Sequence, residues 1–338
     1  MKFLLIALLA VMTGQGALER GDTLLAVSWN LENFFDWRND TLNVSDAGFS
    51  SRGEKRWTRK RFLSKCDLVS KALFYIASKE GSLPDIIAFQ EVENYFVLRQ
   101  LLSKTLLRKA FYGIVHKDSP DPRGIDVAIL YRKDRLELLS YRAARIDSFR
   151  TRDILEAGFA FRAHPGNFSF IACHLPSKYG GEKESFPKRQ TAARALAAVI
   201  DSVVSCGRMA IAAGDFNDTP SSQALMVLEE GAENISRNWL GSVPCGTIRF
   251  EGRWEVIDMF LISRNVDAQI LQSGPCVIPF LMTRDASHPG SRPLRTYSGP
   301  RYLGGVSDHL PVVLKLVLTC PSVSGRRGPQ NQQEEGGG

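Results

Sequence analysis

The sequence predicts a layered α/β domain with mixed β-sheets. Short apolar runs alternate with helical patterns early in the chain, whereas strand patterns dominate its middle and end. The composition, with 44% hydrophobic and 23% charged residues, is typical of a soluble globular protein. A chain of 338 residues is long enough for one large α/β domain with a substantial core.

Apolar runs that end in polar or turn-forming residues predict the strands. The expected strands are Leu24–Trp29, Ile86–Phe89, Val127–Tyr131, Leu136–Tyr141, Phe159–Ala163, Phe168–Cys173, Met209–Ala213, Trp254–Ile262 and Pro311–Leu318. The segment "HPGN" between the fifth and sixth of these indicates a hairpin.

Apolar residues at three- and four-residue spacing predict the helices. The expected helices are Arg59–Ser78, Tyr95–Leu107, Gln190–Val204 and a short one at Gln223–Leu228. Residues 271–305 are rich in Pro, Gly and Ser and show no period, so they are predicted to form a long loop. Loops of this length in compact domains are often functional.

The two ends of the chain differ from the rest. Lys2 precedes the apolar run Phe3–Met12, and small residues follow it, which is typical of a secretory signal peptide. This run is too short to span a bilayer, and no other segment is apolar enough to do so. We therefore expect a signal peptide at residues 1–17, a folded domain at residues 18–319 and a secreted or periplasmic protein. The polar residues 320–338 are expected to be disordered.

The formal net charge of +7 suits an anionic partner, although a basic surface without such a partner would give the same value. The six cysteines include no C-x-x-C pair, so a zinc site is not supported. Export would permit disulfides. Cys245 and Cys276 could form one, and the sequence leaves the pairing open.

Polar side chains recur where predicted strands begin or end. One such residue would be ordinary, because Asp and Asn often start a turn where the chain leaves the core. Six such edges that carry carboxylates, amides and imidazoles indicate a ligand site at the end of a sheet. The main residues at these edges are Asn30, Glu91, His174, Asp215, Asn217, Asp258, Asp308 and His309.

These side chains suggest a chemistry. Carboxylate and amide oxygens without cysteine ligands suit a hard cation, namely Mg²⁺, Mn²⁺ or Ca²⁺. Histidines beside such a site suit proton transfer near neutral pH. A metal and two imidazoliums would offset the charge that grows on a phosphate during attack. The combination fits metal-assisted hydrolysis of a phosphate ester.

Seven segments resemble the signature motifs of the endonuclease/exonuclease/phosphatase superfamily, in the order of that family and over residues 28–314. They are "SWNLENF", "IIAFQEVEN", "GIDVAILYR", "ACHLPS", "AGDFND", "WEVIDMFLIS" and "SDHLPVVL". The resemblance implies a four-layer α/β sandwich, with two mixed β-sheets packed face to face and helices on the outside. It also implies an active site at one end of the sheets.

The resemblance implies the ligands of the metal and of the phosphate. Glu91 matches the principal metal ligand, and Asn30 matches a residue that holds metal or phosphate. Asp308 matches a ligand to the metal or its waters. The family often has an Arg directly before the strand Val127–Tyr131, where this chain has Asp126. Arg123 could take its place as a substrate-binding residue, or it could lie in a solvated loop.

The resemblance also implies catalytic roles. Asp215 and Asn217 match the pair that orients the attacking water and binds the phosphate. His309 matches a base or a phosphate-stabilising imidazole, and Asp258 matches the buried carboxylate that fixes its ring. His174 matches the acid or stabiliser found in the deoxyribonuclease and sphingomyelinase branches, which abasic-site enzymes lack.

The basic stretch at residues 52–61 has two interpretations. It could be a phosphate-binding strip in which Trp57 stacks on substrate, or it could be the exposed start of a helix. The second interpretation is slightly favoured.

The favoured function is a metal-dependent phosphoester hydrolase, as a secreted or periplasmic endonuclease that acts as a monomer on nucleic acid. One alternative is a phosphodiesterase or phosphatase that acts on a lipid headgroup, as a sphingomyelinase does, or on an inositol phosphate. A sphingomyelinase would be expected to have an exposed aromatic hairpin, and the apolar residues 277–282 could supply it or could belong to the core. A further alternative is a non-catalytic binding protein on the same fold.

Export generates the first testable prediction. We expect cleavage close after Gly16 or Ala17, because small residues at these positions follow the apolar run. Mass spectrometry of the exported protein should find a new N-terminus there. Recovery of exported protein that still carries Met1 would contradict the prediction.

Overall fold

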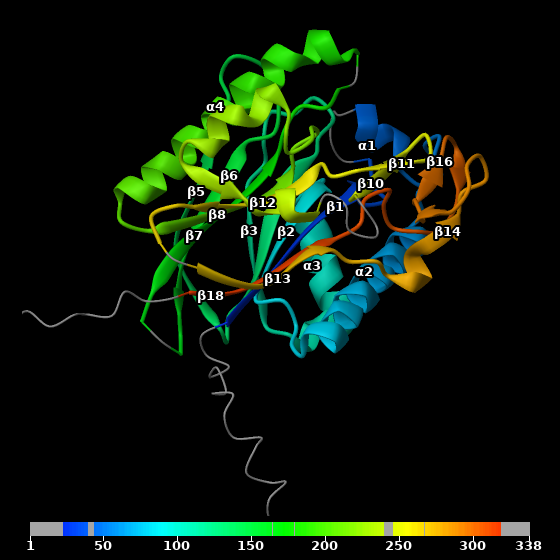
Figure 1. Ribbon diagram of the computed structural model, residues 1–338. Helices are drawn as coiled ribbons and strands as arrows, with labels where there is room; N and C mark the ends of the chain where they lie inside the picture. The colour runs from blue at the N-terminus through cyan, green and yellow to red at the C-terminus, as the bar shows by residue number, and fades with distance from the viewer. Residues whose placement is uncertain are drawn as a thin grey trace, which may run out of the picture.

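Two six-stranded mixed sheets lie at the centre of the fold (Figure 1). The computed structural model describes residues 23–39, 44–163, 165–178, 180–239, 246–266 and 268–318. The predicted signal peptide, the predicted C-terminal tail and Cys245 lie outside these residues. Cleavage of the signal peptide, disorder of the tail and a disulfide at Cys245 therefore stay predictions. Within the described ranges, no helix combines the length and the apolar character needed to cross a membrane.

The first sheet contains one parallel pair, β1 with β2, and its other pairs are antiparallel. Its strands, in spatial order, are β13 (Ala268–Pro275), β18 (Val312–Leu318), β1 (Thr23–Phe34), β2 (Ile86–Val92), β4 (Asp126–Arg132) and β3 (Tyr112–His116). Thr23 pairs with Val317, so the chain enters and leaves the described domain side by side.

The second sheet has the same mixed character, with β7 and β8 as its parallel pair. Its strands, in spatial order, are β5 (Leu136–Ala144), β6 (Ile154–Phe161), β7 (Asn167–His174), β8 (Met209–Asp215), β12 (Asp258–Ser263) and β9 (Ala232–Asn234).

The apolar pattern of the strands explains the layers. In β1, Leu24 and Ala26 pack against the second sheet, whereas Leu25 and Val27 pack under the helices, because successive side chains point to opposite faces. Strands buried on both faces therefore read as continuous apolar runs, as the sequence suggested. The helices α2 (Arg59–Glu80) and α3 (Tyr95–Lys104) cover the first sheet, and α4 (Glu182–Ser205) covers the second (Figure 1). The predicted four-layer sandwich is confirmed.

Helix α4 begins at Glu182, before the predicted start at Gln190. Pro187 lies within these added turns, and a proline normally ends or kinks a helix. In the structure the helix continues through this proline, and Arg189 is fully buried. Its guanidinium contacts Asp218 at 2.9 Å and Ser185 at 2.7 Å. These contacts fix the first turns of α4 against the loop that follows β8.

The prediction of a long loop at residues 271–305 is wrong. The segment completes β13 and then forms two short hairpins, β14 (Met282–Arg284) with β15 (Ser291–Pro293) and β16 (Tyr297–Ser298) with β17 (Arg301–Tyr302). Edge strands and short hairpins need no apolar run, so the pattern did not reveal them. The same reason applies to β3, which was also missed.

Two aromatic or apolar segments are buried instead of exposed. Ile278 and Leu281 belong to the core under the helices, so residues 277–282 do not form an exposed membrane-binding hairpin. Trp57 is fully buried and donates to the carbonyl of Phe35 at 2.8 Å. The interpretation of Trp57 as a stacking surface for substrate is therefore wrong.

The remaining described elements are short. Gln223–Leu228, predicted as a short helix, forms the 3₁₀ turn η2 (Gln223–Glu229). The predicted strand Trp254–Ile262 is divided into β11 (Arg253–Glu255), which pairs with β10 (Ile248–Phe250), and β12. Other short elements are α1 (Val44–Gly48), η1 (Leu106–Lys109), η3 (Ile235–Trp239) and η4 (Pro279–Leu281).

A close approach of two strands generates a stability prediction. A Cβ at Gly214 would lie 1.9 Å from the carbonyl oxygen of Cys173, which belongs to the neighbouring strand. We expect Gly214→Ala to lower the free energy of unfolding by about 1–3 kcal/mol, because both strands are buried and cannot yield freely. Urea unfolding measures this change.

The matched control is Gly48→Ala, where a Cβ would meet nothing within 4 Å. We expect that variant to unfold within about 0.5 kcal/mol of the parent chain. Equal stability of the two variants would contradict the close approach at Gly214.

Candidate active site

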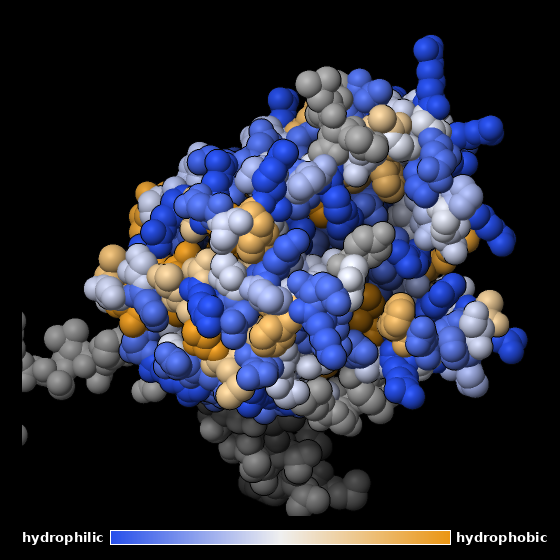
Figure 2. Space-filling view, turned by 90° about the horizontal axis from the view of Figure 1, so that it is seen from above, coloured by the Kyte–Doolittle hydropathy of each residue, from blue (hydrophilic) through white to orange (hydrophobic). Residues whose placement is uncertain are grey.

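The predicted site residues converge at one end of the sandwich, where β1, β2, β7 and β8 end. This end lies at the top of Figure 1, opposite the end where the chain enters at Thr23. Figure 2 views the molecule from this side and shows a mainly hydrophilic face with hydrophobic residues in small, separate groups.

Two irregular strand ends shape the site. The pairing of β1 with β2 shifts register between Asn30 and Phe34, and the pairing of β2 with β4 shifts around Glu91. Glu32, Asn33 and Glu91 have positive φ angles of 48°, 54° and 60°. Such a conformation costs a non-glycine residue on the order of 1–3 kcal/mol and is concentrated at functional sites. Bulges of this kind redirect side chains, and here the amide of Asn33 donates to Glu91 at 2.7 Å.

Arg123 lies over Glu91. Its guanidinium nitrogens are 3.3 and 3.4 Å from the Glu91 carboxylate oxygens, and one of them donates to Asn33 at 2.9 Å. Arg123 lies in an exposed loop, and its guanidinium contacts Glu91. Asp126, which stands where the family often has Arg, instead accepts from Ser119 and contacts His116.

The carboxylate of Asp215 lies at the centre of the site and contacts several of the predicted residues. Its Oδ2 accepts from Asn30 at 3.0 Å and lies 3.4 Å from His174 Nε2 and 3.9 Å from His309 Nε2. Its Oδ1 accepts from the amide of Asn217 at 2.8 Å. Burial raises the pKa of Asp215 to about 7; the charge of His309 acts against this rise and that of Asp258 adds to it. Five predicted residues thus lie around or beside one buried carboxylate.

The hydrogen bond expected between Asp258 and His309 is present, with 2.8 Å between Oδ2 and Nδ1. Both residues are buried, and Thr247 Oγ1 accepts from the Asp258 amide. Burial of the ring opposes its charge, but the carboxylates of Asp258 and Asp215 outweigh burial and hold the pKa of His309 well above its usual 6.5. His309 is therefore a cation near neutral pH in this structure.

His174 has the opposite electrostatic setting. Burial, followed by the positive charges of Arg152, Arg123 and His309, holds the pKa of His174 well below its usual 6.5. This environment favours the neutral ring over the imidazolium that was expected. Its Nδ1 is buried and finds no hydrogen-bond partner among the described residues.

A network of charged residues lies near Glu91. The sequence did not predict that these residues contact one another. Arg295 lies 2.8 Å from Glu32 and 3.2 Å from Asp308, and buried Lys65 donates to the Glu32 carbonyl at 2.7 Å. Burial, together with Asp308, raises the pKa of Glu32 to about 7 against the pull of Arg295 and Lys65. Burial lowers the pKa of Lys65 to about 8 despite Glu32 and Glu91.

Little in the sequence indicates that these residues belong to the site. Glu32 follows a predicted strand, as the site residues do, but Lys65 lies within a helix and Arg295 within the segment predicted as a loop. A lysine that falls on the buried face of an amphipathic helix was the one available clue.

Acidic residues that could bind a metal ion are present. Two groups of acid and imidazole side chains in the described residues have ligand atoms within 4.8 Å of one another: Asp215 with Asp258 and His309, and His116 with Asp118 and Asp126. Glu91 belongs to neither group and contacts Arg123 instead. The predicted ligands Glu91, Asp308 and Asn30 all offer oxygen atoms, which suit a hard cation. The nearby cations Arg123 and Arg295 now neutralise these carboxylates.

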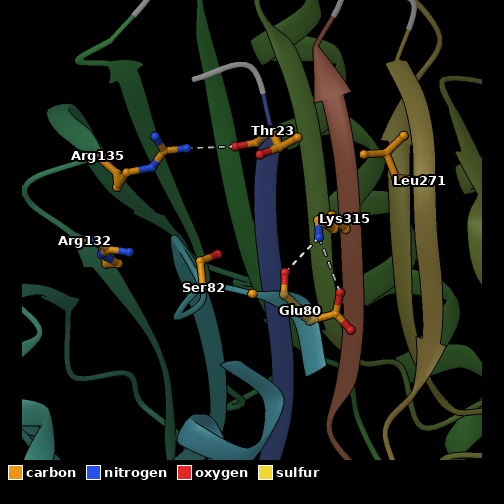
Figure 3. Close-up of a pocket in the computed structure, with 8 residues that line it drawn as sticks. Thr23, Glu80, Ser82, Arg132, Arg135, Leu271 and Lys315 are labelled. Atoms are coloured by element: carbon orange, nitrogen blue, oxygen red, sulfur yellow. Dashed lines mark hydrogen bonds and ion pairs between the residues drawn. The ribbon is translucent and has the colours of Figure 1, made fainter. Parts of the chain in front are cut away.

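A hollow of about 460 Å³ lies at the opposite end of the sandwich and is distinct from this site (Figure 3). Its three cations each have a carboxylate partner. Lys315 contacts Glu80, whose carbonyl also accepts from Lys315 at 2.9 Å. The other two pairs are Arg135 with Asp85 and Arg132 with Asp134. Charge pairing, and the absence of the predicted site residues from its lining, separate this hollow from the catalytic end.

Comparison with known proteins identifies the family. Residues 25–317 match the family described as "Endonuclease/Exonuclease/phosphatase family". The match covers most of the chain, so the protein belongs to this family, whose members are phosphoester hydrolases. No curated protein sequence matches the chain.

Solved structures share the fold at low sequence identity. The human nocturnin catalytic domain with bound sulfate is 17% identical, with a TM-score of 0.56 over 88% of this chain and 95% of that one. D. rerio TDP2 with a single-strand DNA product is 16% identical, with a TM-score of 0.54 over 87% and 98%. A mannosyl-6-phosphatase of Bacteroides thetaiotaomicron is 18% identical, with a TM-score of 0.53 over 87% and 100%. These similarities establish the fold.

The Asp258–His309 hydrogen bond generates a prediction for whichever phosphoester the protein hydrolyses. We expect Asp258→Asn to lower turnover by roughly two to four decades with little change in substrate affinity, because the ring loses its oriented anionic partner. His309→Ala should cost at least as much. Steady-state kinetics of both variants measure the losses.

The double variant separates a joint role from two independent roles. If the two residues act as one unit, Asp258→Asn with His309→Ala should be no slower than His309→Ala alone. Multiplication of the two losses would show that Asp258 works independently of His309.

Proposed function

We propose that the protein is a metal-dependent phosphodiesterase, and specifically an endonuclease that cleaves nucleic acid. The observation that carries this proposal is the cluster around Asp215. One buried carboxylate lies within 4 Å of an amide donor and two imidazoles, which is the set of groups that can hold a phosphate and activate water.

The proposed roles follow from the contacts. Asp215 orients the attacking water and accepts its proton, and its carboxylate is held in place by Asn30 and by the amide of Asn217. The Asn217 side chain donates to the Leu175 carbonyl at 2.9 Å, which fixes it beside His174 at the phosphate. An amide can donate to a phosphate oxygen without the repulsion that a carboxylate would bring.

The imidazoles act on the phosphate. The water oxygen forms the new bond to phosphorus, and the bond to the leaving oxygen breaks. His309 is a cation held by Asp258, so it offsets the charge that grows on the phosphate oxygens. The neutral His174 stabilises the phosphate as a hydrogen-bond donor. The leaving oxygen takes its proton from His309 or from solvent.

The metal would be held by Glu91, Asp308 and Asn30. Mg²⁺ or Mn²⁺, with Ca²⁺ as a third candidate, matches their oxygen donors. When bound, the metal supplies Lewis-acid stabilisation of the phosphate. Glu91 is paired with Arg123, and Asp308 is paired with Arg295. A bound cation would share these carboxylates with the two arginines or would replace the arginines as their partner.

Nucleic acid is the favoured substrate because the catalytic end is hydrophilic and the chain is basic. The complex of D. rerio TDP2 with a single-strand DNA product lends support as a similar fold. A phosphatase is the second candidate, because the similar mannosyl-6-phosphatase carries a phosphomonoesterase activity in its name. The lipid-headgroup alternative is less favoured, because residues 277–282 were expected to form an exposed hairpin and Ile278 and Leu281 are instead buried in the core. We also propose, from the sequence, that the protein is exported and acts as a monomer.

Metal removal tests the mechanism. We expect EDTA to abolish hydrolysis of bis(p-nitrophenyl) phosphate and Mg²⁺ or Mn²⁺ to restore it, because the proposed ligands are oxygen donors. Glu91→Gln should require a metal concentration at least about tenfold higher for half-maximal rate, since it removes a charged ligand. Full activity in metal-free buffer would rule out the mechanism.

A control variant guards against a general loss of structure. Glu54→Gln changes the same charge on an exposed side chain. It should keep the metal requirement of the parent chain. A panel of plasmid DNA, RNA, sphingomyelin, inositol phosphates and sugar phosphates then identifies the substrate class.

A further inference from the structure

We propose that two hollows on either side of the catalytic centre form one continuous track that holds a nucleic-acid chain on both sides of the cleaved bond. This inference rests on the proposed phosphodiesterase function and deepens it. It assigns Arg150 and Lys188 as binding residues, which belong to none of the family motifs.

The first hollow, called here the Arg150 hollow, has a volume of about 460 Å³. The residues that matter in its lining are Arg123, Phe149, Arg150, Arg152 and Lys188. Buried Arg152 donates to the carbonyls of His174 and Leu175 at 3.2 and 2.8 Å. The wall of the hollow therefore continues directly into the strand end that carries His174.

The second hollow, called here the Lys55 hollow, has a volume of about 240 Å³. It is lined mainly by Glu32, Asn33, Phe49, Lys55, Arg295 and Tyr297. The Lys55 ammonium donates to the Gly299 carbonyl at 2.9 Å, and the Tyr297 hydroxyl donates to the Lys55 carbonyl at 2.9 Å. These contacts bring the basic stretch at residues 52–61 against the β16–β17 hairpin. Lys55, rather than Trp57, is the residue of that stretch that faces a hollow.

The two hollows meet above the candidate metal ligand. Asn33 lines the Lys55 hollow and Arg123 lines the Arg150 hollow, and the two side chains are joined at 2.9 Å. Both also contact Glu91, through the Asn33 amide and the Arg123 guanidinium. A chain that occupies both hollows must therefore pass over Glu91.

Two cations of the Arg150 hollow distinguish this track from the hollow at the other end of the molecule, although Lys55, Arg123, Arg152 and Arg295 have carboxylate partners. Arg150 donates to the Pro120 carbonyl at 3.2 Å, and neither Arg150 nor Lys188 has a carboxylate partner in the described part of the chain. In the hollow of Figure 3, by contrast, Lys315 contacts Glu80. Arg132 and Arg135 of that hollow pair with Asp134 and Asp85. Cations without a protein partner can bind phosphates and release counterions.

The arrangement determines what the site can hold. A phosphomonoester or a chain end fills the centre and at most one hollow. An internal phosphodiester places flanking phosphates in both hollows at once, which favours cleavage within a chain over cleavage from its ends.

The test uses full-length protein and the double variant Arg150→Gln with Lys188→Gln. The substrates are a single-stranded oligonucleotide of about twelve nucleotides, labelled at one end, and bis(p-nitrophenyl) phosphate, which has no flanking phosphates. We expect the ratio of kcat/KM for the oligonucleotide to that for the small ester to fall at least about tenfold. The slope of log affinity against log salt should shrink by about 1.4, because two contacts at about 0.7 each are removed.

The charge-matched control is Lys79→Gln with Lys104→Gln, two exposed lysines near the ends of α2 and α3. It should leave the ratio and the salt slope as they are in the parent chain. Lys55→Gln tests the other hollow independently, and we expect its ratio to fall as well. Equal effects of the track variants and the control would overturn the inference.

Three further results distinguish this inference from the proposed function. Cleavage of closed circular single-stranded DNA supports the track, whereas release of nucleotides only from free ends overturns it. Hydrolysis of the small ester without any cleavage of nucleic acid overturns the track and leaves the phosphodiesterase standing. Absence of hydrolysis of either substrate with any of the three metals overturns both.

Discussion

The hydrogen bond from Asn30 to Asp215 joins the two sheets at the end where the site lies, and the rest of the site depends on this contact. Asn30 belongs to β1 of the first sheet and Asp215 to β8 of the second, so the face-to-face packing of the sheets must bring these two strand ends together. The core between the sheets fixes that packing through apolar residues of both. Neighbouring strands then deliver His174, which is paired with Asp215 across β7 and β8, and Asp258, which is paired with Asp215 across β12 and β8.

Buried charge is the second constraint on the site. Several carboxylates lie close together in a largely buried region, and each contacts a cation. Asp258 is matched by His309, Glu91 by Arg123, and Glu32 and Asp308 by Arg295. The arginines at the edge of this cluster also line the two hollows, so the same charges that pair with the carboxylates are in position to meet a phosphate chain.

Much of the fold could be predicted because its central strands are buried on both faces. Runs such as Met209–Ala213 are apolar at every position, and this leaves a clear signal in the sequence. The edge strands β3 and β13 carry no long apolar run and escaped detection. Helix α4 was predicted too short because its first turns depend on contacts of Arg189 with residues distant in sequence, and local pattern cannot reveal such contacts.

The sequence by itself determined the family motifs, the central strands and the residues that gather around Asp215, because these residues sit at fixed offsets from apolar runs. Tertiary structure alone decided their electrostatic states. His174 and His309 are both imidazoles at strand ends, yet their pKa values shift in opposite directions. Burial and nearby arginines lower the pKa of His174, whereas the carboxylates of Asp258 and Asp215 outweigh burial and raise the pKa of His309. Tertiary structure also decided which side chains lie near the site. Trp57 is buried, whereas Lys55 lines a hollow. Arg295, from a segment without a periodic pattern, contacts Asp308. The hydrophobic pattern of the sequence indicates which residues are buried. The protonation state and the solvent exposure of a side chain depend on neighbours that only folding brings together.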